Sequence, residues 1–159
     1  MSIEIAKKHL EKLGLGDRVM EFEVSSATVE LAAQAVGVEG ARIAKTLSFY
    51  LGESCLLVLA AGDARVDNKK FKARFAQKAR MLAPEDALRM TGHAVGGVCP
   101  FGVPEDVEVY TDVSLKRFDT VYPAAGNDRS AVRLSCEELY TAAGSRGWVD
   151  VCKDWDRPE

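Results

Sequence analysis

Lys45 is the residue of this sequence best placed to act on a polar or anionic group. It lies in residues 41–51, whose apolar residues predict a strand that enters a hydrophobic core. A lysine drawn toward an apolar interior must find a partner, shift its pKa or extend its ammonium back to water. The sequence therefore predicts a polar or anionic group beside Lys45, which is either a ligand or a structural carboxylate such as Asp63 or Asp112.

A glycine-rich segment, residues 92–104, is the second chemically distinctive feature. It holds four glycines and two prolines in thirteen positions. This composition predicts a rigid, exposed loop whose backbone amides can approach a ligand closely. An ordinary connection is the alternative, but Gly96-Gly97 and the run from Pro100 to Gly102 exceed what a plain turn requires.

Cys99 and His93 lie on the same loop, and a cysteine paired with a histidine is a known catalytic nucleophile. No third orienting group is identifiable, so a thiol mechanism is the less favoured interpretation. Asp63 and Asp67, four residues apart, are interpreted as turn and cap residues rather than as a metal pair. The four cysteines are scattered and form no Cys-x-x-Cys motif, so we expect neither a metal site nor another cofactor.

A basic segment follows these aspartates. Between positions 69 and 80 there are six basic residues and no acidic one, namely Lys69, Lys70, Lys72, Arg74, Lys78 and Arg80. One interpretation is the solvated face of a helix, and the other is a local phosphate-binding patch. The net charge of −3 argues against a general nucleic-acid binder.

The composition is that of an ordinary globular protein, with 47% apolar and 28% charged residues. A length of 159 residues predicts one domain over 1–159 with a core that needs no disulfide or metal. No apolar run approaches the roughly 20 residues of a membrane span, and the N-terminus lacks the order of a signal peptide. We therefore expect a cytoplasmic protein without a membrane partner.

The chain alternates irregularly between helical and extended patterns. Helices are expected at residues 3–13, at 29–36 after a Ser25 or Ser26 cap, from Asp67 or Asn68 through Phe71 and Phe75, at 84–91, and from Ser135 toward Gly144. Strands are expected at 19–24, 46–51, 55–61, 107–110, 120–122, 131–134 and 148–151, with Lys45 at the entrance of a hairpin. The absence of a regular βαβ period predicts an α+β fold with a mixed sheet.

Four motifs together resemble a known family. They are residues 25–30, Ile43-Ala44-Lys45-Thr46-Leu47, Ala61-Gly62-Asp63, and Thr91-Gly92 followed by residues 96–102. In this order and spacing they are similar to the YbaK-like aminoacyl-tRNA deacylases, freestanding relatives of the editing domain inserted in bacterial prolyl-tRNA synthetases. The similarity extends from about Val24 to Leu139.

The resemblance implies one α+β domain built round a mixed, barrel-like sheet and surrounded by helices. It also implies hydrolysis of the ester that joins a wrong amino acid to a tRNA, with a synthetase as a candidate partner. By position, the implied catalytic residues are Lys45, Gly96, Gly97 and Gly102. The implied substrate-binding residues are Gly92, Cys99, Pro100, Phe101, Asp112 and Gly126. Cys99 stands where serine is common, and Ala124-Ala125-Gly126 replaces a more glycine-rich turn.

This chemistry agrees with the residues themselves. Amides of a rigid glycine loop can stabilise the oxyanion of ester hydrolysis, at about 10²–10³ in rate for each donor. No side-chain base stands out, so a hydroxyl or amine of the substrate is expected to orient the water. Lys69, Lys70 and Lys72 are the expected tRNA contacts. The alternative function is a non-catalytic module on the same fold that binds RNA or a synthetase.

Overall fold

The computed structural model describes residues 2–155, and at its centre lies a long antiparallel hairpin. Its two strands are β2 (Ile43–Leu51) and β3 (Ser54–Ala61). All residues of β3 after Ser54 are fully buried, as their continuous apolar run predicts for a central strand. Gly52 opens the connecting turn at a φ of +60°, the conformation that a tight hairpin turn requires at its first loop position.

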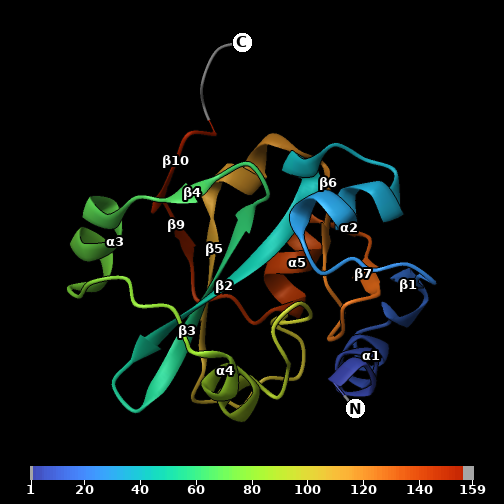
Figure 1. The fold of residues 1–159 in the computed structure, drawn as a ribbon, viewed down its shortest axis with the longest axis horizontal. Coiled ribbons are helices and arrows are strands. Elements are labelled where there is room, and N and C mark those ends of the chain that lie inside the picture. The colour runs from blue at the N-terminus through green and yellow to red at the C-terminus, as the bar shows by residue number, and fades with distance from the viewer. Residues whose placement is uncertain (1, 156–159) are drawn as a thin grey trace.

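Further strands extend the hairpin on both sides into a six-stranded sheet of order β8-β6-β2-β3-β5-β9. The added strands are β5 (Glu108–Asp112), β6 (Thr120–Pro123), β8 (Leu134–Ser135) and β9 (Trp148–Val149). The sheet mixes parallel and antiparallel pairs and curls into a half-barrel (Figure 1). The predicted α+β fold with a mixed, barrel-like sheet is confirmed.

Two small antiparallel pairs complete the strands. One joins β1 (Val19–Glu21) to β7 (Ser130–Val132), and the other joins β4 (Arg65–Val66) to β10 (Cys152–Lys153). The sequence predicted one strand at 131–134, but β7 and β8 divide this segment between two sheets. The strand predicted at 19–24 ends at Glu21, and Val24 is 60% exposed.

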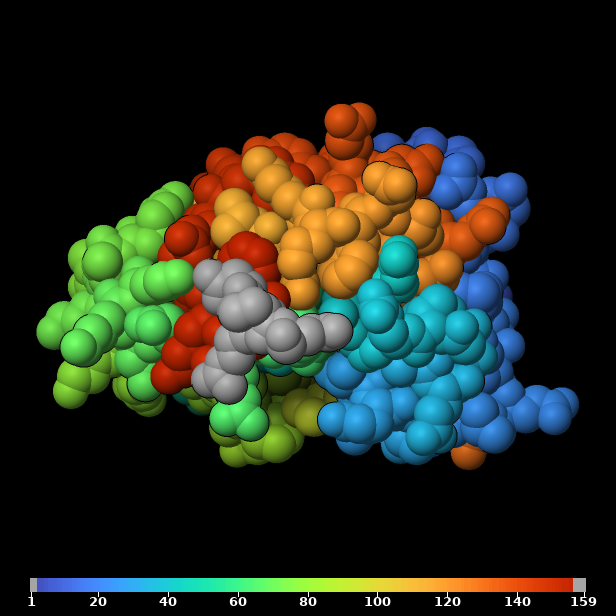
Figure 2. Space-filling view, turned by 90° about the horizontal axis from the view of Figure 1, so that it is seen from above, coloured from blue at the N-terminus to red at the C-terminus, as the bar shows by residue number. Residues whose placement is uncertain are grey.

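Five α-helices within residues 2–155 surround the sheet: α1 (Ser2–Lys12), α2 (Val29–Val36), α3 (Asn68–Phe75), α4 (Pro84–Thr91) and α5 (Cys136–Ala142). Short 3-10 turns lie at Gly16–Arg18, Gly40–Arg42 and Val113–Arg117. Helix α3 and the segment after it project at one end of the molecule, away from α1 and α2 (Figures 1 and 2). In this part of the chain, no helix is long and apolar enough to cross a membrane.

The helix ends follow local capping chemistry. Asp67 caps α3, and Ser135 with Glu138 forms the predicted capping box of α5. The predicted Ser25 or Ser26 cap of α2 is wrong, because Thr28 accepts the hydrogen bond of the Leu31 amide at 3.1 Å. Ser26 is buried instead and bonds to Ser130 from the β7 strand.

The position of Lys45 also differs from the prediction. Strand β2 begins at Ile43, three residues before the predicted start, so Lys45 lies inside the strand and is paired with Ala60. The lysine interrupts the apolar pattern without ending the strand. Its ammonium extends beyond the strand to backbone carbonyls, which lets the backbone keep its pairing with β3.

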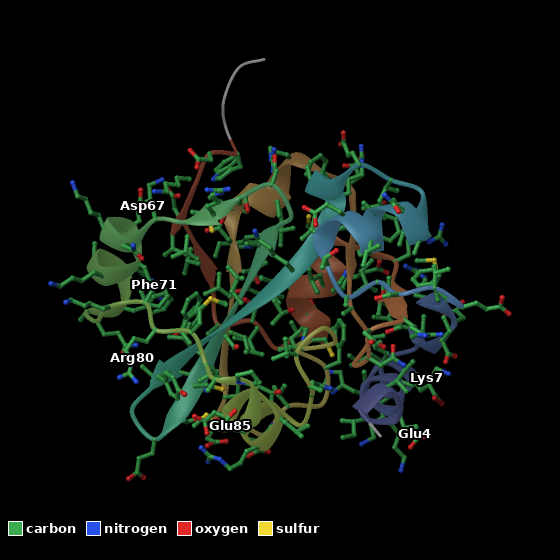
Figure 3. The ribbon with its side chains drawn as sticks, viewed as in Figure 1. Glu4, Lys7, Asp67, Phe71, Arg80 and Glu85 are labelled. Atoms are coloured by element: carbon green, nitrogen blue, oxygen red, sulfur yellow. The ribbon has the colours of Figure 1, made fainter. Side chains whose placement is uncertain are left out.

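Helix α3 is attached to the sheet through aromatic contacts. Phe71 lies on α3 (Figure 3). The centre of its ring lies 4.8 Å from the ring centres of both Phe49 and Phe75, and Phe71 is fully buried. We expect Phe71→Ala to lower the free energy of unfolding by about 3–5 kcal/mol, because it leaves a cavity in this cluster. Urea unfolding measures the change, and Leu88→Ala, at a position 53% exposed, is the control with an expected effect within about 0.5 kcal/mol. Equal effects of the two substitutions would contradict this account of the core.

Candidate active site

A cavity of about 400 Å³ opens beside the edge of β2. Its wall combines β2 with parts of α2, the segment before α4, the glycine-rich loop and the strands β6 and β7. The lining residues are Ser26, Ala27, Thr28, Val29, Ala32, Ile43, Ala44, Lys45, Thr46, Ser48, Met81, Leu82, Pro84, Val95, Gly96, Val98, Tyr122, Ala124, Ser130 and Ala131. Lys45 is the only Lys, Arg, Asp or Glu in this set.

The cavity exists because the outer edge of β2 is paired only near its two ends. At the first end, β6 pairs with Ile43 and Ala44. At the other end, Met81 bridges to Phe49, and the Leu82 amide donates to the Ser48 carbonyl at 3.1 Å. Among the described residues no strand pairs with the outer edge at 45–47, so this stretch faces the cavity.

The Lys45 ammonium is held by two backbone carbonyls. It donates to the carbonyl of Ala64 and, at 3.4 Å, to that of Gly62. The side chain is half-buried, and this burial lowers the pKa of Lys45 because desolvation disfavours the charged form. An ammonium has three N–H donors, and these two carbonyls use two of them, so one donor is left over.

The carboxylates predicted as structural partners of Lys45 are bound elsewhere. Asp63 accepts two hydrogen bonds from Arg117, at 2.6 and 3.0 Å. Asp112 is buried and accepts from the amides of Ser114 and Val151 at 3.0 and 2.9 Å. Asp112 therefore stabilises the chain after β5 and does not line the cavity.

Gly62 explains the Ala61-Gly62-Asp63 motif. A side chain at this position would overlap the Gly40 carbonyl oxygen and approach the Val29 side chain within 2.7 Å. Only glycine therefore lets the turn after β3 pack against the segment before β2. This close packing fixes the Gly62 carbonyl that accepts from Lys45.

The glycine-rich loop reaches the cavity through one tight turn. The Gly97 amide donates to the Ala94 carbonyl at 3.0 Å, and Gly96 has a φ of +96°, as glycine does in a type II turn. Gly96 lines the cavity, and its amide has no hydrogen-bond partner in the part of the chain that the structure describes. A side chain at Gly97 would overlap the backbone of Asn127, so Gly97 brings the loop against the turn before β7.

The other predicted residues of the loop lie away from the cavity. Gly92 ends α4 at a φ of +83°, and a side chain at Gly102 would overlap that of Ile5 on α1. Three further residues of the loop are buried: Cys99, Pro100 and Phe101. Gly126 is also buried and is absent from the lining. Lys45 and Gly96 thus line the same cavity, and Gly97 follows Gly96 in the turn. The roles that the resemblance implies for all of these residues stay predictions.

Cys99 and His93 do meet, although nothing in the sequence showed it. The Cys99 sulfur lies 3.5 Å from Nε2 of His93, which is also 2.9 Å from the Phe101 carbonyl oxygen. Both residues are fully buried in the core and outside the cavity lining. Burial raises the pKa of Cys99 to about 12 and lowers that of His93. The thiol is therefore protonated near neutral pH and shielded from substrate.

Sequence reasoning missed the hydroxyl groups of the cavity wall. They belong to Ser26, Thr28, Thr46, Ser48, Tyr122 and Ser130. The Thr46 hydroxyl is buried and has no partner among the described residues. The signal was present in part, because Thr46 and Ser48 alternate with Lys45 and Leu47 along a predicted strand. The hydroxyl groups from the segment before α2, from β6 and from β7 depend on tertiary packing.

The expected tRNA contacts on α3 separate into two groups. Lys69 and Lys72 line a second cavity, whereas Lys70 donates to Asp150 at 3.1 Å and to the Cys152 carbonyl. Their contact with tRNA stays a prediction.

Comparison with known proteins identifies the family of this chain. The sequence profile described as "aminoacyl-tRNA editing domain" matches residues 23–142, which include every cavity-lining residue. This chain belongs to the aminoacyl-tRNA editing domain family. The resemblance stated from the motifs is thereby confirmed at the level of the family.

Several relatives of this editing domain are known. The uncharacterized protein YwhH of Bacillus subtilis is 52% identical over 157 residues, which cover 98% of this chain and 100% of YwhH. The proline–tRNA ligase of Thermotoga maritima is 34% identical over 90 residues, which cover 56% of this chain but only 15% of the ligase. A crystal structure described as a proposed trans-editing enzyme for prolyl-tRNA synthetase superposes with a TM-score of 0.86 at 32% identity, covering 96% of this chain and 98% of the other.

The burial of Cys99 has a direct consequence for its reactivity. We expect the folded editing domain to leave Cys99 unmodified by iodoacetamide at neutral pH, because the thiol is protonated and inaccessible. Mass spectrometry of peptides measures the labelling, and the same protein in denaturant is the control in which Cys99 should react. Rapid labelling in the folded state would contradict the buried position.

The lowered pKa of Lys45 also predicts a pH dependence of stability. Below its ordinary value of 10.5 there is a range in which the unfolded chain keeps the Lys45 proton and the folded protein releases it. Stability relative to Lys45→Met should therefore rise with pH in that range, since the unfolded state binds more protons. Urea unfolding of both proteins at several pH values up to 10.5 measures the difference between their free energies of unfolding. A difference that stays constant with pH would contradict the lowered pKa of Lys45.

Proposed function

We propose that this protein hydrolyses the ester bond between an amino acid and the 3′ end of a misacylated tRNA. The observation that carries the proposal is the position of Lys45. It brings a single ammonium to an otherwise uncharged and largely apolar lining, as far as the described residues show. The uncharged wall suits an aminoacyl group, and the ammonium suits an ester oxygen or a terminal phosphate. Membership of the aminoacyl-tRNA editing domain family supports this substrate class.

Lys45 is the proposed electrostatic group of the reaction. Its ammonium is fixed by the carbonyls of Gly62 and Ala64 before any ligand binds. A donor held in this way needs little reorganisation when negative charge develops on the substrate. In the half-buried site its attraction for an oxyanion is also stronger than in bulk water.

Gly96 is the proposed second donor. Gly96 lies on the cavity wall and its amide has no partner among the described residues, whereas the Gly97 amide is already bonded to Ala94. The two glycines that the resemblance implies as catalytic thus receive different roles here. Gly96 supplies an amide to the substrate, and Gly97 holds the turn against Asn127.

The proposed reaction begins with a water molecule that adds to the ester carbonyl carbon. The carbonyl π electrons move to the oxygen, and Lys45 and the Gly96 amide stabilise the resulting oxyanion. When the oxyanion collapses, the bond between the carbonyl carbon and the ribose oxygen breaks. The ribose oxygen then takes the proton that the attacking water has released. The products are the free amino acid and the deacylated tRNA.

The substrate is the proposed source of the proton acceptor for the attacking water. The cavity lining holds no carboxylate, histidine or cysteine among the described residues. The vicinal hydroxyl of the terminal ribose or the α-amine of the amino acid lies close to the ester carbonyl in any aminoacyl-tRNA. An ester also needs less activation than an amide, so this arrangement is sufficient for turnover.

Removal of Lys45 tests the proposal. We expect Lys45→Ala to lower single-turnover deacylation by about 10²–10³, the effect of one oxyanion donor. Lys45→Arg should fail as well, because a planar guanidinium cannot keep the two carbonyl contacts and present the same donor. A panel of mischarged tRNAs serves as substrate, and Lys8→Ala on α1 is the control with unchanged rate.

The outcome also separates the two function classes. Wild-type protein that binds tRNA but deacylates no member of the panel would support the non-catalytic binding module instead. Near-normal turnover by a folded Lys45→Ala variant, with circular dichroism as the folding check, would contradict the role given to Lys45.

A further inference from the structure

The six basic residues between positions 69 and 80 separate into two groups in the structure. Arg74 lies 5.1 Å from the Tyr110 ring centre, Arg80 lies 4.9 Å from that of Tyr50, and Lys70 donates to Asp150. These three cations are held by the protein itself. The remaining three have ammonium groups without a hydrogen bond or ion pair in the described part of the chain: Lys69, Lys72 and Lys78.

These three lysines line one cavity of about 370 Å³, together with Asn68 and Ala79. Lys69 and Lys72 share a face of α3 because they are three residues apart. Ala76 ends α3 at a φ of +59°, and the Gln77 side chain donates to the Tyr50 carbonyl at 2.6 Å. This anchored turn brings Lys78 back to the same cavity. We call this site the basic cavity.

The lining of the basic cavity contains no carboxylate among the described residues. The closest acidic residue in the sequence, Asp67, accepts hydrogen bonds from the amides of Lys69 and Lys70 at 3.0 Å and serves as the cap of α3. Three like charges round one hollow raise the local positive potential. A bound anion relieves this repulsion, and a phosphate is the anion that Lys commonly binds as a point charge.

A short extended segment joins the basic cavity to the cavity of Lys45. Ala79 lines the first, and Met81 and Leu82 line the second. The segment runs along β2, where the Tyr50 amide donates to the Arg80 carbonyl at 2.9 Å. Leu82 lies four positions after Lys78, which corresponds to about 13 Å of extended chain. A stacked strand that rises about 3.4 Å per nucleotide covers this length with roughly four nucleotides.

We propose that the basic cavity binds the backbone phosphates of the single-stranded tRNA 3′ end, in the nucleotides that precede the esterified one. This inference rests on the proposed function, because it places the esterified nucleotide in the cavity of Lys45. It assigns the contacts to Lys69, Lys72 and Lys78, and it gives Lys70 a structural role.

Equilibrium binding of uncharged tRNA at several salt concentrations tests the inference without any turnover. The salt slope is the steepness with which the logarithm of the binding constant falls against the logarithm of the salt concentration. Neutralising one lysine that binds a single-strand phosphate should reduce this slope by about 0.7. We expect a reduction of about 0.7 in Lys78→Gln and of about 2 in the variant with Lys69, Lys72 and Lys78 all changed to Gln. Lys12→Gln, which removes an equal charge from α1, is the control without change, and Lys70→Gln should change the slope less than Lys78→Gln.

A tRNA that lacks its last four nucleotides locates the phosphates that are bound. Wild-type protein should bind this shortened tRNA with the reduced slope of the triple variant, and the triple variant should bind both RNAs equally. If shortening leaves the wild-type slope unchanged while the triple variant still lowers it, the lysines bind the duplex stem and the inference is wrong. If the triple variant has the wild-type slope, the basic cavity binds no phosphate.

The outcome of these binding experiments does not depend on whether the protein hydrolyses the ester. A protein that binds tRNA with the expected slopes but hydrolyses no mischarged tRNA would overturn the proposed function and leave the phosphate site standing. A protein that deacylates normally while the triple variant keeps the wild-type slope would overturn the phosphate site alone.

Discussion

The site depends on the way the Lys45 ammonium is held by the carbonyls of Gly62 and Ala64. A half-buried lysine without such contacts would lose hydration and gain nothing in return. Because both acceptors are backbone atoms, the ammonium forms no ion pair with a carboxylate among the described residues, and one of its three donors is left over. The close packing of Gly62 against Gly40 fixes one of these acceptors. A glycine outside the glycine-rich loop therefore helps to position the Lys45 ammonium.

The central strand creates the space in which this ammonium acts. Strand β2 is paired along nearly its full length with β3 but only near its two ends on the outer edge. Backbone pairing on one side fixes the strand, while the gap on the other side leaves room for the cavity. The segment after α3 closes one end of the gap and β6 the other, so the sheet itself sets the limits of the cavity.

Much of this arrangement was predictable from local patterns, and the remainder depended on packing. The apolar run of β3, the Asp67 cap and the Ser135–Glu138 capping box are local signals, and the structure contains each of them. The four motifs that indicated the family are also short local patterns, read together with their order and spacing along the chain. The Thr46 and Ser48 hydroxyls lie on the same strand as Lys45, but the other hydroxyl-bearing residues of the wall come from distant segments, which no local pattern brings together. The grouping of Lys78 with α3 depends on the turn at Ala76, where a non-glycine residue adopts a left-handed conformation.

The cavity wall has a consequence for how such a domain can diverge. Apart from Lys45 and the Gly96 amide, the wall consists mainly of apolar and hydroxyl-bearing side chains contributed by several separate segments. If the substrate carries the remaining reactive groups, the volume and polarity of the wall can change without disturbing the chemistry. Selectivity for one amino acid and the capacity for hydrolysis are then separable properties, and point substitutions in the wall can move a descendant from one misacylated product to another.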